Sequence, residues 1–162
     1  MAKSFKRSTK FDATPEKALS VLTNPEFQVE RETAQDNCVG AEYKEISRSD
    51  TRLVYEVINT EYAKGVTGID KNKTERVTYT YTWDLARKSC TWVYRSDHGD
   101  RVKVSGSLKI VTGPANTSVL DDDFTVEVKI PLVGGKIEGI IMKEVEAGWP
   151  KYEKVLRAWL SK

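Results

Sequence analysis

The sequence predicts an α+β fold in which a seven-stranded, curved antiparallel sheet wraps one long C-terminal helix, with two short helices after the first strand. Three observations predict it. Residues 39–130 alternate apolar and polar side chains with the period of two that strands show. Residues 137–160 instead repeat apolar side chains every three or four positions, as a helix does. Two signals for a helix start stand in tandem near residues 14 and 24.

The first strand and the tandem helices are predicted from the N-terminal forty residues. Residues 5–11 alternate, with Phe5, Arg7, Thr9 and Phe11 on one face, and the segment is short enough for an edge strand. Thr14-Pro15 and Asn24-Pro25 each place a capping side chain before a proline, and an acidic residue follows. They predict one helix that runs to residue 23 and a second that ends before the turn at residues 36–37.

Six further strands are predicted between residues 39 and 130, divided by polar turn clusters at 49–50, 70–73, 87–88, 97–100 and 113–116. The faces predicted to point inward are Val39, Ala41 and Tyr43; Leu53, Tyr55 and Val57; Val77, Tyr79, Tyr81, Trp83 and Leu85; Cys90, Trp92 and Tyr94; Val102, Val104, Leu108 and Ile110; Leu120, Phe124, Val126, Val128 and Ile130. Short connections favour an antiparallel meander with one face toward solvent.

The last segment is predicted to be one long helix whose apolar stripe is Ile137, Ile141, Val145, Gly148, Tyr152, Val155 and Trp159. At about 1.5 Å per residue it spans on the order of 36 Å, enough to cross a curved sheet. Pro150 lies inside this helix and removes one backbone hydrogen bond, so we expect a bend that follows the curvature of the sheet.

This arrangement resembles the helix-grip fold of the START-like (SRPBCC) superfamily, which includes polyketide cyclases, lipid-transfer domains and birch-pollen-type allergens. The chain is most similar to a bacterial branch catalogued as a domain of unknown function. The resemblance rests on residues 13–16 (ATPE), 22–27 (LTNPEF) and above all 130–138 (IPLVGGKIE). In the last motif, Gly134-Gly135 is expected to allow a positive φ or a close backbone approach where the strand joins the helix. The resemblance covers the whole chain, so residues 1–162 are interpreted as a single domain.

Composition excludes several classes of function. The chain of 162 residues carries 26 Lys and Arg against 24 Asp and Glu, and a net charge of +2 does not indicate a dedicated nucleic-acid binder. No segment has the roughly 18 uninterrupted apolar residues of a membrane span, and the N-terminus lacks a secretion signal. We therefore expect a cytoplasmic protein.

Candidate nucleophiles and metal ligands are few. Cys38 and Cys90 are the two cysteines and show no metal-ligand spacing, so they are interpreted as reduced, half-buried thiols. The one histidine, His98, lies in a polar turn where its neighbours already explain the bend. No GxSxG motif occurs. We expect no triad hydrolase, no metal and no cofactor.

The acidic run 121–123 leaves two interpretations open. Strand alternation places Asp122 on the inner face, where an unpaired carboxylate is costly. Either Asp122 is a polar contact inside a cavity, or a bulge places all three acids outside, which is the interpretation we favour from the sequence.

The aromatic residues are the most informative feature, because Tyr and Trp carry polar tips that suit a cavity better than a dry core. The helix-grip resemblance also implies a ligand between sheet and helix. The predicted cavity-lining residues are Tyr55, Tyr79, Tyr81, Trp83, Trp92, Tyr94, Asp122, Phe124, Ile141, Val145 and Trp149. Further polar groups could come from Arg7, Thr9, Asn59, Glu61 and Glu45, although Glu45 and Glu61 are expected to reach solvent at strand ends.

The leading functional hypothesis is a binding or carrier protein for a small hydrophobic or amphipathic molecule: a lipid, a fatty acid or an aromatic polycyclic. It includes transient membrane contact during ligand exchange. A cyclase-like enzyme that uses Asp122 and the tyrosines is the second class, and a cochaperone-like interaction module the third. Binding of single-stranded nucleic acid is disfavoured, because the apolar stripe of the last helix needs the aromatic face as its partner.

Overall fold

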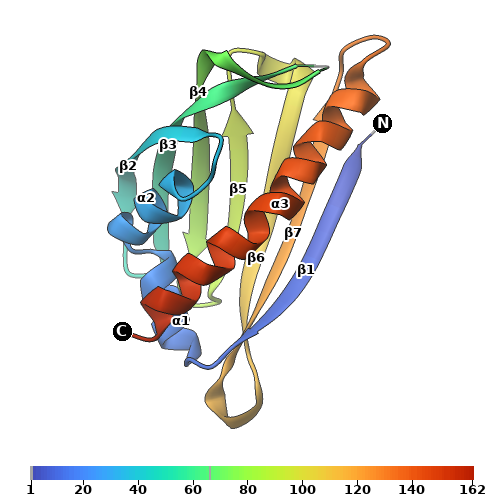
Figure 1. Ribbon diagram of the computed structural model, residues 1–162. Coiled ribbons are helices and arrows are strands. Elements are labelled where there is room, and N and C mark those ends of the chain that lie inside the picture. The colour runs from blue at the N-terminus through green and yellow to red at the C-terminus, as the bar shows by residue number, and fades with distance from the viewer. Residues whose placement is uncertain (1, 66) are drawn as a thin grey trace.

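The computed structural model describes residues 2–65 and 67–162, and the strands and helices below all lie within them. In chain order these are β1 (Lys3–Phe11), α1 (Pro15–Leu22), α2 (Pro25–Thr33), β2 (Cys38–Arg48), β3 (Arg52–Gly65), β4 (Gly68–Asp84), β5 (Ser89–Arg95), β6 (Val102–Thr112), β7 (Ser118–Val128) and α3 (Gly134–Leu160) (Figure 1). The strands form one sheet in the order β1-β7-β6-β5-β4-β3-β2, and every neighbouring pair is antiparallel. The predicted α+β fold, with seven antiparallel strands and two short helices after β1, is confirmed.

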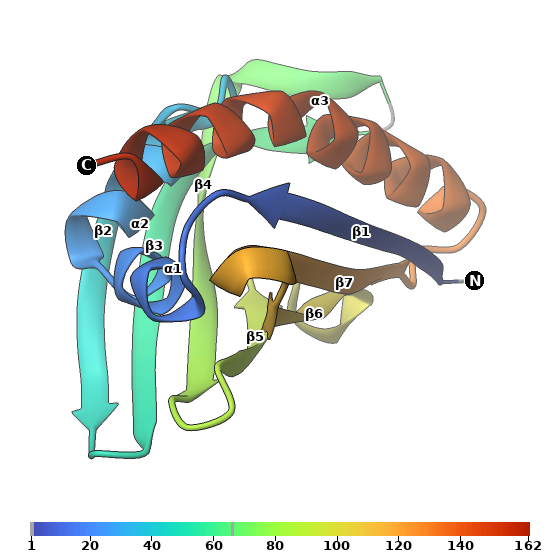
Figure 2. The ribbon, with the colours of Figure 1, turned by 90° about the horizontal axis from the view of Figure 1, so that it is seen from below.

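The sheet is curved, and α3 crosses its concave face (Figure 1). Seen from below, α3 arches over the hollow of the sheet, and α1 and α2 lie near the C-terminal part of α3 at one end (Figure 2). α3 begins at Gly134, three residues before the predicted start, and continues through Pro150. β1 is an edge strand, as predicted.

The two short helices begin where the sequence predicts. Thr14 Oγ1 accepts a hydrogen bond of 3.1 Å from the backbone N–H of Lys17. Asn24 Oδ1 accepts from two backbone N–H groups, those of Glu26 at 2.8 Å and Phe27 at 3.2 Å. Each cap satisfies backbone donors that have no partner within the helix, which stabilises the start of α1 and of α2.

The main hydrophobic core lies at that end of the concave face. It includes Leu22, Phe27, Tyr55, Trp83 and Leu156, whose exposed fractions are 1% or less. The Tyr55 hydroxyl donates to the carbonyl of Leu22 at 3.2 Å, and Trp83 Nε1 donates to the Tyr55 hydroxyl at the same distance. The polar tips of Tyr55 and Trp83 are therefore satisfied by protein groups.

Two details of the strand prediction are wrong. Residues 70–73 form no hairpin turn but lie inside β4, where the pairing jumps from Tyr62 opposite Thr74 to Ala63 opposite Asp70. Residues 71–73, which lie between these pairs, form a bulge. Polar residues are common in bulges and in turns, so composition alone predicted a turn here. Val39 was predicted to point inward but is 55% exposed, since an irregularity between Cys38 and Gly40 shifts the register of β2.

The joint between β7 and α3 is held by close backbone approach and a buried carboxylate. A Cβ atom on Gly134 would lie 2.2 Å from the carbonyl oxygen of Val128, so this glycine is required for close approach, as predicted. The positive φ of the joint belongs instead to Leu132, at 71°. Glu138, fully buried, accepts a hydrogen bond of 2.8 Å from the Val128 N–H and fixes α3 to the end of β7.

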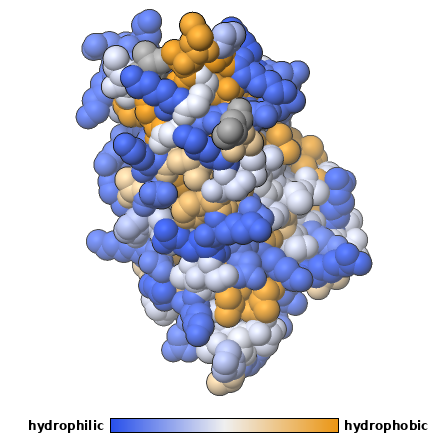
Figure 3. Space-filling model, turned by 90° about the vertical axis from the view of Figure 1, so that its right-hand side faces the viewer, coloured by the Kyte–Doolittle hydropathy of each residue, from blue (hydrophilic) through white to orange (hydrophobic). Residues whose placement is uncertain are grey.

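The face drawn in Figure 3 is mostly hydrophilic, with apolar side chains gathered near the top and a smaller apolar group in the lower half. Leu132 is the most exposed of the large apolar side chains identified on the surface of the described residues. None of the helices described is long and apolar enough to cross a membrane.

Candidate functional site

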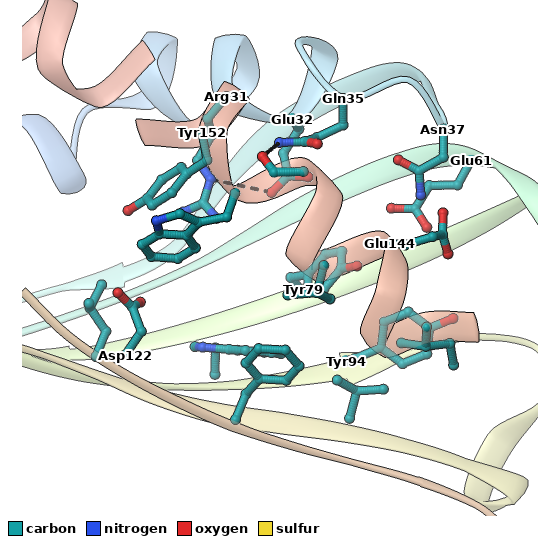
Figure 4. Close-up of a pocket in the computed structure, with 18 of the residues that line it drawn as sticks. Arg31, Glu32, Gln35, Asn37, Glu61, Tyr79, Tyr94, Asp122, Glu144 and Tyr152 are labelled. Atoms are coloured by element: carbon teal, nitrogen blue, oxygen red, sulfur yellow. Dashed lines mark hydrogen bonds and ion pairs between the residues drawn. The ribbon is translucent and has the colours of Figure 1, made fainter. Parts of the chain in front are cut away.

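A cavity of about 230 Å³ lies between the concave face of the sheet and α3 (Figure 4). A water molecule takes up about 30 Å³ of liquid, so the space suits a small organic molecule. Its sheet wall is Tyr79, Tyr81, Trp92, Tyr94, Val102, Val104, Leu108, Asp122 and Phe124; its helix wall is Ile141, Glu144, Val145, Gly148, Trp149 and Tyr152; and Arg31, Glu32, Gln35, Asn37, Glu61 and Lys64 complete it.

Four aromatic side chains from β4 and β5 form the floor of the cavity. Tyr79 lies opposite Tyr94 and Tyr81 opposite Trp92, so all four point to the same face. The ring centroids are 5.5 Å apart for Tyr79 and Tyr94, and 6.0 Å apart for Tyr79 and Trp92. Contacts at these distances fix the rings without filling the space above them.

Trp92 takes its position because β6 carries a glycine opposite it. Trp92 is paired with Gly106, and a Cβ on that glycine would lie 2.5 Å from the indole ring. The indole therefore packs against the β6 backbone and reaches Phe124 of β7, at a centroid distance of 6.0 Å. This glycine lets the aromatic floor extend across β6.

The helix wall carries two aromatic side chains whose polar tips are unpaired within the described chain. Trp149 and Tyr152 are one turn apart on α3, with ring centroids 5.0 Å apart. Trp149 Nε1 and the Tyr152 hydroxyl are buried and have no hydrogen-bond partner among the described residues. They contrast with the satisfied tips of Tyr55 and Trp83.

Arg31 of α2 brings a positive charge to the same end of the cavity. Its guanidinium lies 4.2 Å from the centroid of the Tyr152 ring, a cation–π contact. Its Nε is 3.6 Å from Glu32 Oε1, which makes an ion pair. Guanidinium groups stay charged in proteins, so this end always carries a cation.

A cluster of carboxylates around Lys64 forms a second polar region. Lys64 Nζ lies 3.1 Å from Glu61 Oε1 and 3.9 Å from Glu144 Oε2. The Asn59 amide donates to Glu32 at 2.9 Å and to Glu61 at 3.1 Å. Burial opposes the charge on Lys64, but Glu61 and Glu144 outweigh it and raise its pKa. Burial, followed in each case by smaller charge effects, raises the pKa of Glu32 and of Glu144.

Asp122 faces the cavity from β7. The β7 ladder is continuous, with Arg7 of β1 on one side of Asp122 and Leu108 of β6 on the other, so the favoured bulge is wrong. Its Oδ2 is buried and has no partner among the described residues. Burial raises the pKa of Asp122 to about 7, although Arg31 partly opposes the shift. At neutral pH this carboxyl group is therefore able both to donate and to accept a proton.

The tyrosine hydroxyls of the cavity stay protonated. Burial is the largest cause that raises the pKa of Tyr79, Tyr81 and Tyr152 above the ordinary value for tyrosine. They are available as hydrogen-bond donors and acceptors, and not as phenolate bases at neutral pH.

Comparison with models of known families identifies the family of this chain. The family model described as "Protein of unknown function (DUF2505)" matches residues 6–160. The chain belongs to the DUF2505 family. No curated protein matches this DUF2505 sequence significantly.

Solved structures share the fold of this DUF2505 protein at low sequence identity. The Zhui aromatase/cyclase from Streptomyces sp. R1128 has a TM-score of 0.67 at 11% identity, with 99% of this chain and 94% of that one covered. TTHA0849 from Thermus thermophilus has 0.65 at 14%, with 98% and 97% covered. A START superfamily protein from Mycobacterium smegmatis has 0.59 at 15%, also with 98% and 97% covered. The START-like resemblance seen in the sequence is thereby confirmed for the fold.

Nine of the eleven predicted site residues line the cavity of the DUF2505 protein: Tyr79, Tyr81, Trp92, Tyr94, Asp122, Phe124, Ile141, Val145 and Trp149. The structure places Tyr55 and Trp83 elsewhere, in the fully buried core beside α1. Alternation along a strand identifies the inner face, but it does not show where along that face the helices close onto the sheet.

The further polar residues considered for the cavity differ from the prediction in which of them reach solvent. Glu61 was expected to reach solvent, but it is 4% exposed and lines the cavity. Glu45 is exposed and pairs with Arg48, as expected. Arg7 lies on the inner face of β1, where its guanidinium is 4.7 Å from the centroid of the Trp149 ring.

Sequence reasoning missed the contribution of α2 and of the residues directly after it. Arg31, Glu32 and Gln35 line the cavity but come from a strongly polar segment that resembles a solvated helix end. Gln35 donates to the carbonyl of Gly148 at 3.1 Å, and a Cβ on that glycine would lie 2.3 Å from Gln35 Oε1. The glycine in the apolar stripe of α3 was the one signal that another segment packs closely there.

The cysteines and His98 do not build a reactive centre. Burial raises the pKa of the Cys38 thiol to about 11 and that of Cys90 to about 12, so neither is a thiolate at neutral pH. His98 Nε2 lies 3.2 Å from Glu75 Oε2 in a surface turn. Across residues 2–65 and 67–162, no cluster of three His, Cys, Asp or Glu side chains has the arrangement of a metal site.

Proposed function

We propose that this DUF2505 protein binds a small hydrophobic or amphipathic molecule, such as a lipid, a fatty acid or an aromatic polycyclic, between the sheet and α3. The observation that carries the proposal is a cavity with aromatic and aliphatic walls and a few inward polar groups, the usual chemistry of a ligand pocket. The nine predicted residues that line it are the proposed contact residues. START superfamily and aromatase/cyclase neighbours support a cavity of this type through fold alone.

Native mass spectrometry of the freshly purified protein, followed by solvent extraction, tests this proposal. We expect an adduct that is lost on denaturation. Val145→Trp should abolish the adduct, because residue 145 lines the cavity and the indole would fill it. Ala147→Trp is the matched control, since that position on α3 is exposed. A clean apo mass, together with no thermal shift across fatty acids, sterol-like and aromatic compounds, would contradict ligand binding.

A cyclase-like enzyme is the second candidate, and Asp122 is the observation that favours it. A carboxyl group with a pKa near neutrality inside a cavity is suited to general acid–base catalysis. Incubation with a panel of polyketide substrates should then give product that Asp122→Asn abolishes while binding persists. Conversion that survives Asp122→Asn would exclude Asp122 as the acid–base group.

The other two classes fit the geometry less well. α3 lies over the concave face of the sheet (Figure 2), and its residues enclose the same cavity as the aromatic side chains, which argues against an open platform for stacking bases. An interaction module like the helix-grip cochaperones is expected to have a small or filled cavity and an exposed apolar patch, and the open volume of about 230 Å³ supports ligand binding instead. We retain transient membrane contact during ligand exchange, and a cytoplasmic location, as parts of the binding proposal.

A further inference from the structure

Two unsatisfied polar groups on α3 indicate what the ligand brings to the cavity. Trp149 and Tyr152 both line it and are only 8% and 4% exposed. Neither Trp149 Nε1 nor the Tyr152 hydroxyl has a hydrogen-bond partner within the described part of the chain. Buried polar groups nearly always have partners, because leaving one unpaired is costly. The missing partner is expected to enter with the ligand.

Arg31 adds further donors at the same end of the cavity. Its guanidinium lies on the Tyr152 ring, and its ion pair with Glu32, at 3.6 Å, is longer than a hydrogen bond. A guanidinium has five N–H donors, so most of its capacity stays available to a ligand. Trp149 Nε1 also acts only as a donor, so the group that satisfies this end must accept hydrogen bonds.

The charges nearby decide between a charged and an uncharged acceptor. Glu32 already neutralises Arg31, and Asp122 faces the same end from the opposite wall (Figure 4). Arg7 lies opposite Asp122 and over the Trp149 ring, so two acidic groups here face two guanidinium groups. A ligand carboxylate would add a third acid to this balanced, buried set, which is unfavourable. A neutral oxygen such as a carbonyl accepts the same hydrogen bonds without that repulsion.

We propose that the ligand carries an uncharged carbonyl oxygen, of a ketone, ester or amide, that accepts hydrogen bonds from Arg31, Trp149 Nε1 and the Tyr152 hydroxyl. The inference rests on the proposed binding function and narrows it. The aromatic body of the ligand lies on the floor formed by Tyr79, Tyr81 and Trp92, and its carbonyl points to the end where α2 meets α3.

Three naphthalene probes of one shape test this inference: 2-acetylnaphthalene, 2-naphthoate and 2-ethylnaphthalene. They carry a ketone, a carboxylate and no oxygen, respectively, and their dissociation constants are measured by titration calorimetry. We expect the ketone to bind about tenfold more tightly than the hydrocarbon, and more tightly than the carboxylate. With a ¹³C label on the ketone carbonyl, the infrared stretch of the bound probe should shift to lower wavenumber than in alkane solvent.

Tyr152→Phe removes one donor and keeps the ring that supports Arg31. It should weaken ketone binding about tenfold, raise the carbonyl wavenumber and leave the hydrocarbon unaffected. Tyr43→Phe is the matched control, because the Tyr43 hydroxyl is also buried without a partner among the described residues but Tyr43 does not line the cavity. It should change none of these quantities. Arg31→Met, with folding checked by circular dichroism, should likewise reduce the preference for the ketone.

The outcomes separate this inference from the proposed function. Equal affinity for all three probes, or tightest binding of the carboxylate, would overturn the carbonyl inference and leave the binding function standing. Tyr152→Phe that weakens the ketone and the hydrocarbon alike would also overturn it, because the hydroxyl would then act only through packing. Failure of every probe, together with a clean apo mass of the purified protein, would overturn both.

Discussion

The two ends of the concave face use the same residue types in different ways. At the end beside α1, Trp83 Nε1 donates to the Tyr55 hydroxyl, which donates to the carbonyl of Leu22. At the cavity end, Trp149 Nε1 and the Tyr152 hydroxyl have no such partner in the described chain. Residue type therefore does not separate a structural aromatic from a binding one. What differs between these two pairs is the partner of the polar tip.

The largest expected effect contrasts a tryptophan from each end. Trp83→Ala should lower the free energy of unfolding by about 3–5 kcal/mol, because it empties a fully buried site. Trp92→Ala should cost only about 1–2 kcal/mol, since the indole of Trp92 faces a cavity and is only partly buried. Urea unfolding monitored by circular dichroism measures both. Similar losses for the two variants would show that the cavity end is packed as tightly as the core.

A smaller effect is expected from the titration of Asp122. Its pKa of about 7 lies above the ordinary value of 3.8, so the folded protein binds the proton more tightly than the unfolded chain. The free energy of unfolding should therefore fall as the pH rises from about 4 to 7, by up to about 4 kcal/mol from this group. The raised pKa of Glu32 and of Glu144 contributes in the same direction.

Variants at neighbouring positions of β7 isolate that contribution. Asp122→Asn should flatten the pH dependence and make the protein more stable than wild type at pH 8. Asp123→Asn serves as the control, because Asp123 is half exposed and pairs with Lys6 across the surface. A slope that Asp122→Asn leaves intact would assign the dependence to the other carboxyl groups.

The smallest effect contrasts two hydroxyl groups. Tyr55→Phe should lower the free energy of unfolding by about 1–3 kcal/mol, because it leaves the Trp83 indole N–H without its acceptor. Tyr152→Phe should leave stability unchanged or slightly raised, since the hydroxyl that it removes has no partner in the described residues. Thermal unfolding of the two variants measures the difference. A larger loss for Tyr152→Phe would mean that this hydroxyl is satisfied within the protein.

Much of the fold was predictable because its signals are local. The caps Thr14 and Asn24 act on N–H groups two or three residues ahead, and both helices begin where these caps predict. Strand alternation likewise identified the inner face for six of the predicted residues that line the cavity: Tyr79, Tyr81, Trp92, Tyr94, Asp122 and Phe124. Where an extra residue interrupts a strand, as at Val39, the same alternation predicts the wrong face.

The candidate site was less predictable because it joins distant segments. Asp122 was left between a cavity and a bulge, and only the unbroken pairing of β7 with β1 and β6 places it inside. Glu61 is buried because Lys64 and Asn59 satisfy its oxygens, a compensation that strand periodicity does not reveal. Arg31 lies in a polar helix whose sequence gives no sign of a cavity.

The elements, their order and the inner face of most strands can be read from the amino-acid sequence, since they follow from interactions between residues a few positions apart. Which inner aromatics are packed and satisfied, and which line a cavity, is set by the tertiary structure. That division depends on where α1, α2 and α3 meet the curved sheet. The Tyr55 hydroxyl finds its acceptor 33 positions away, at Leu22, whereas the described chain brings none to Tyr152.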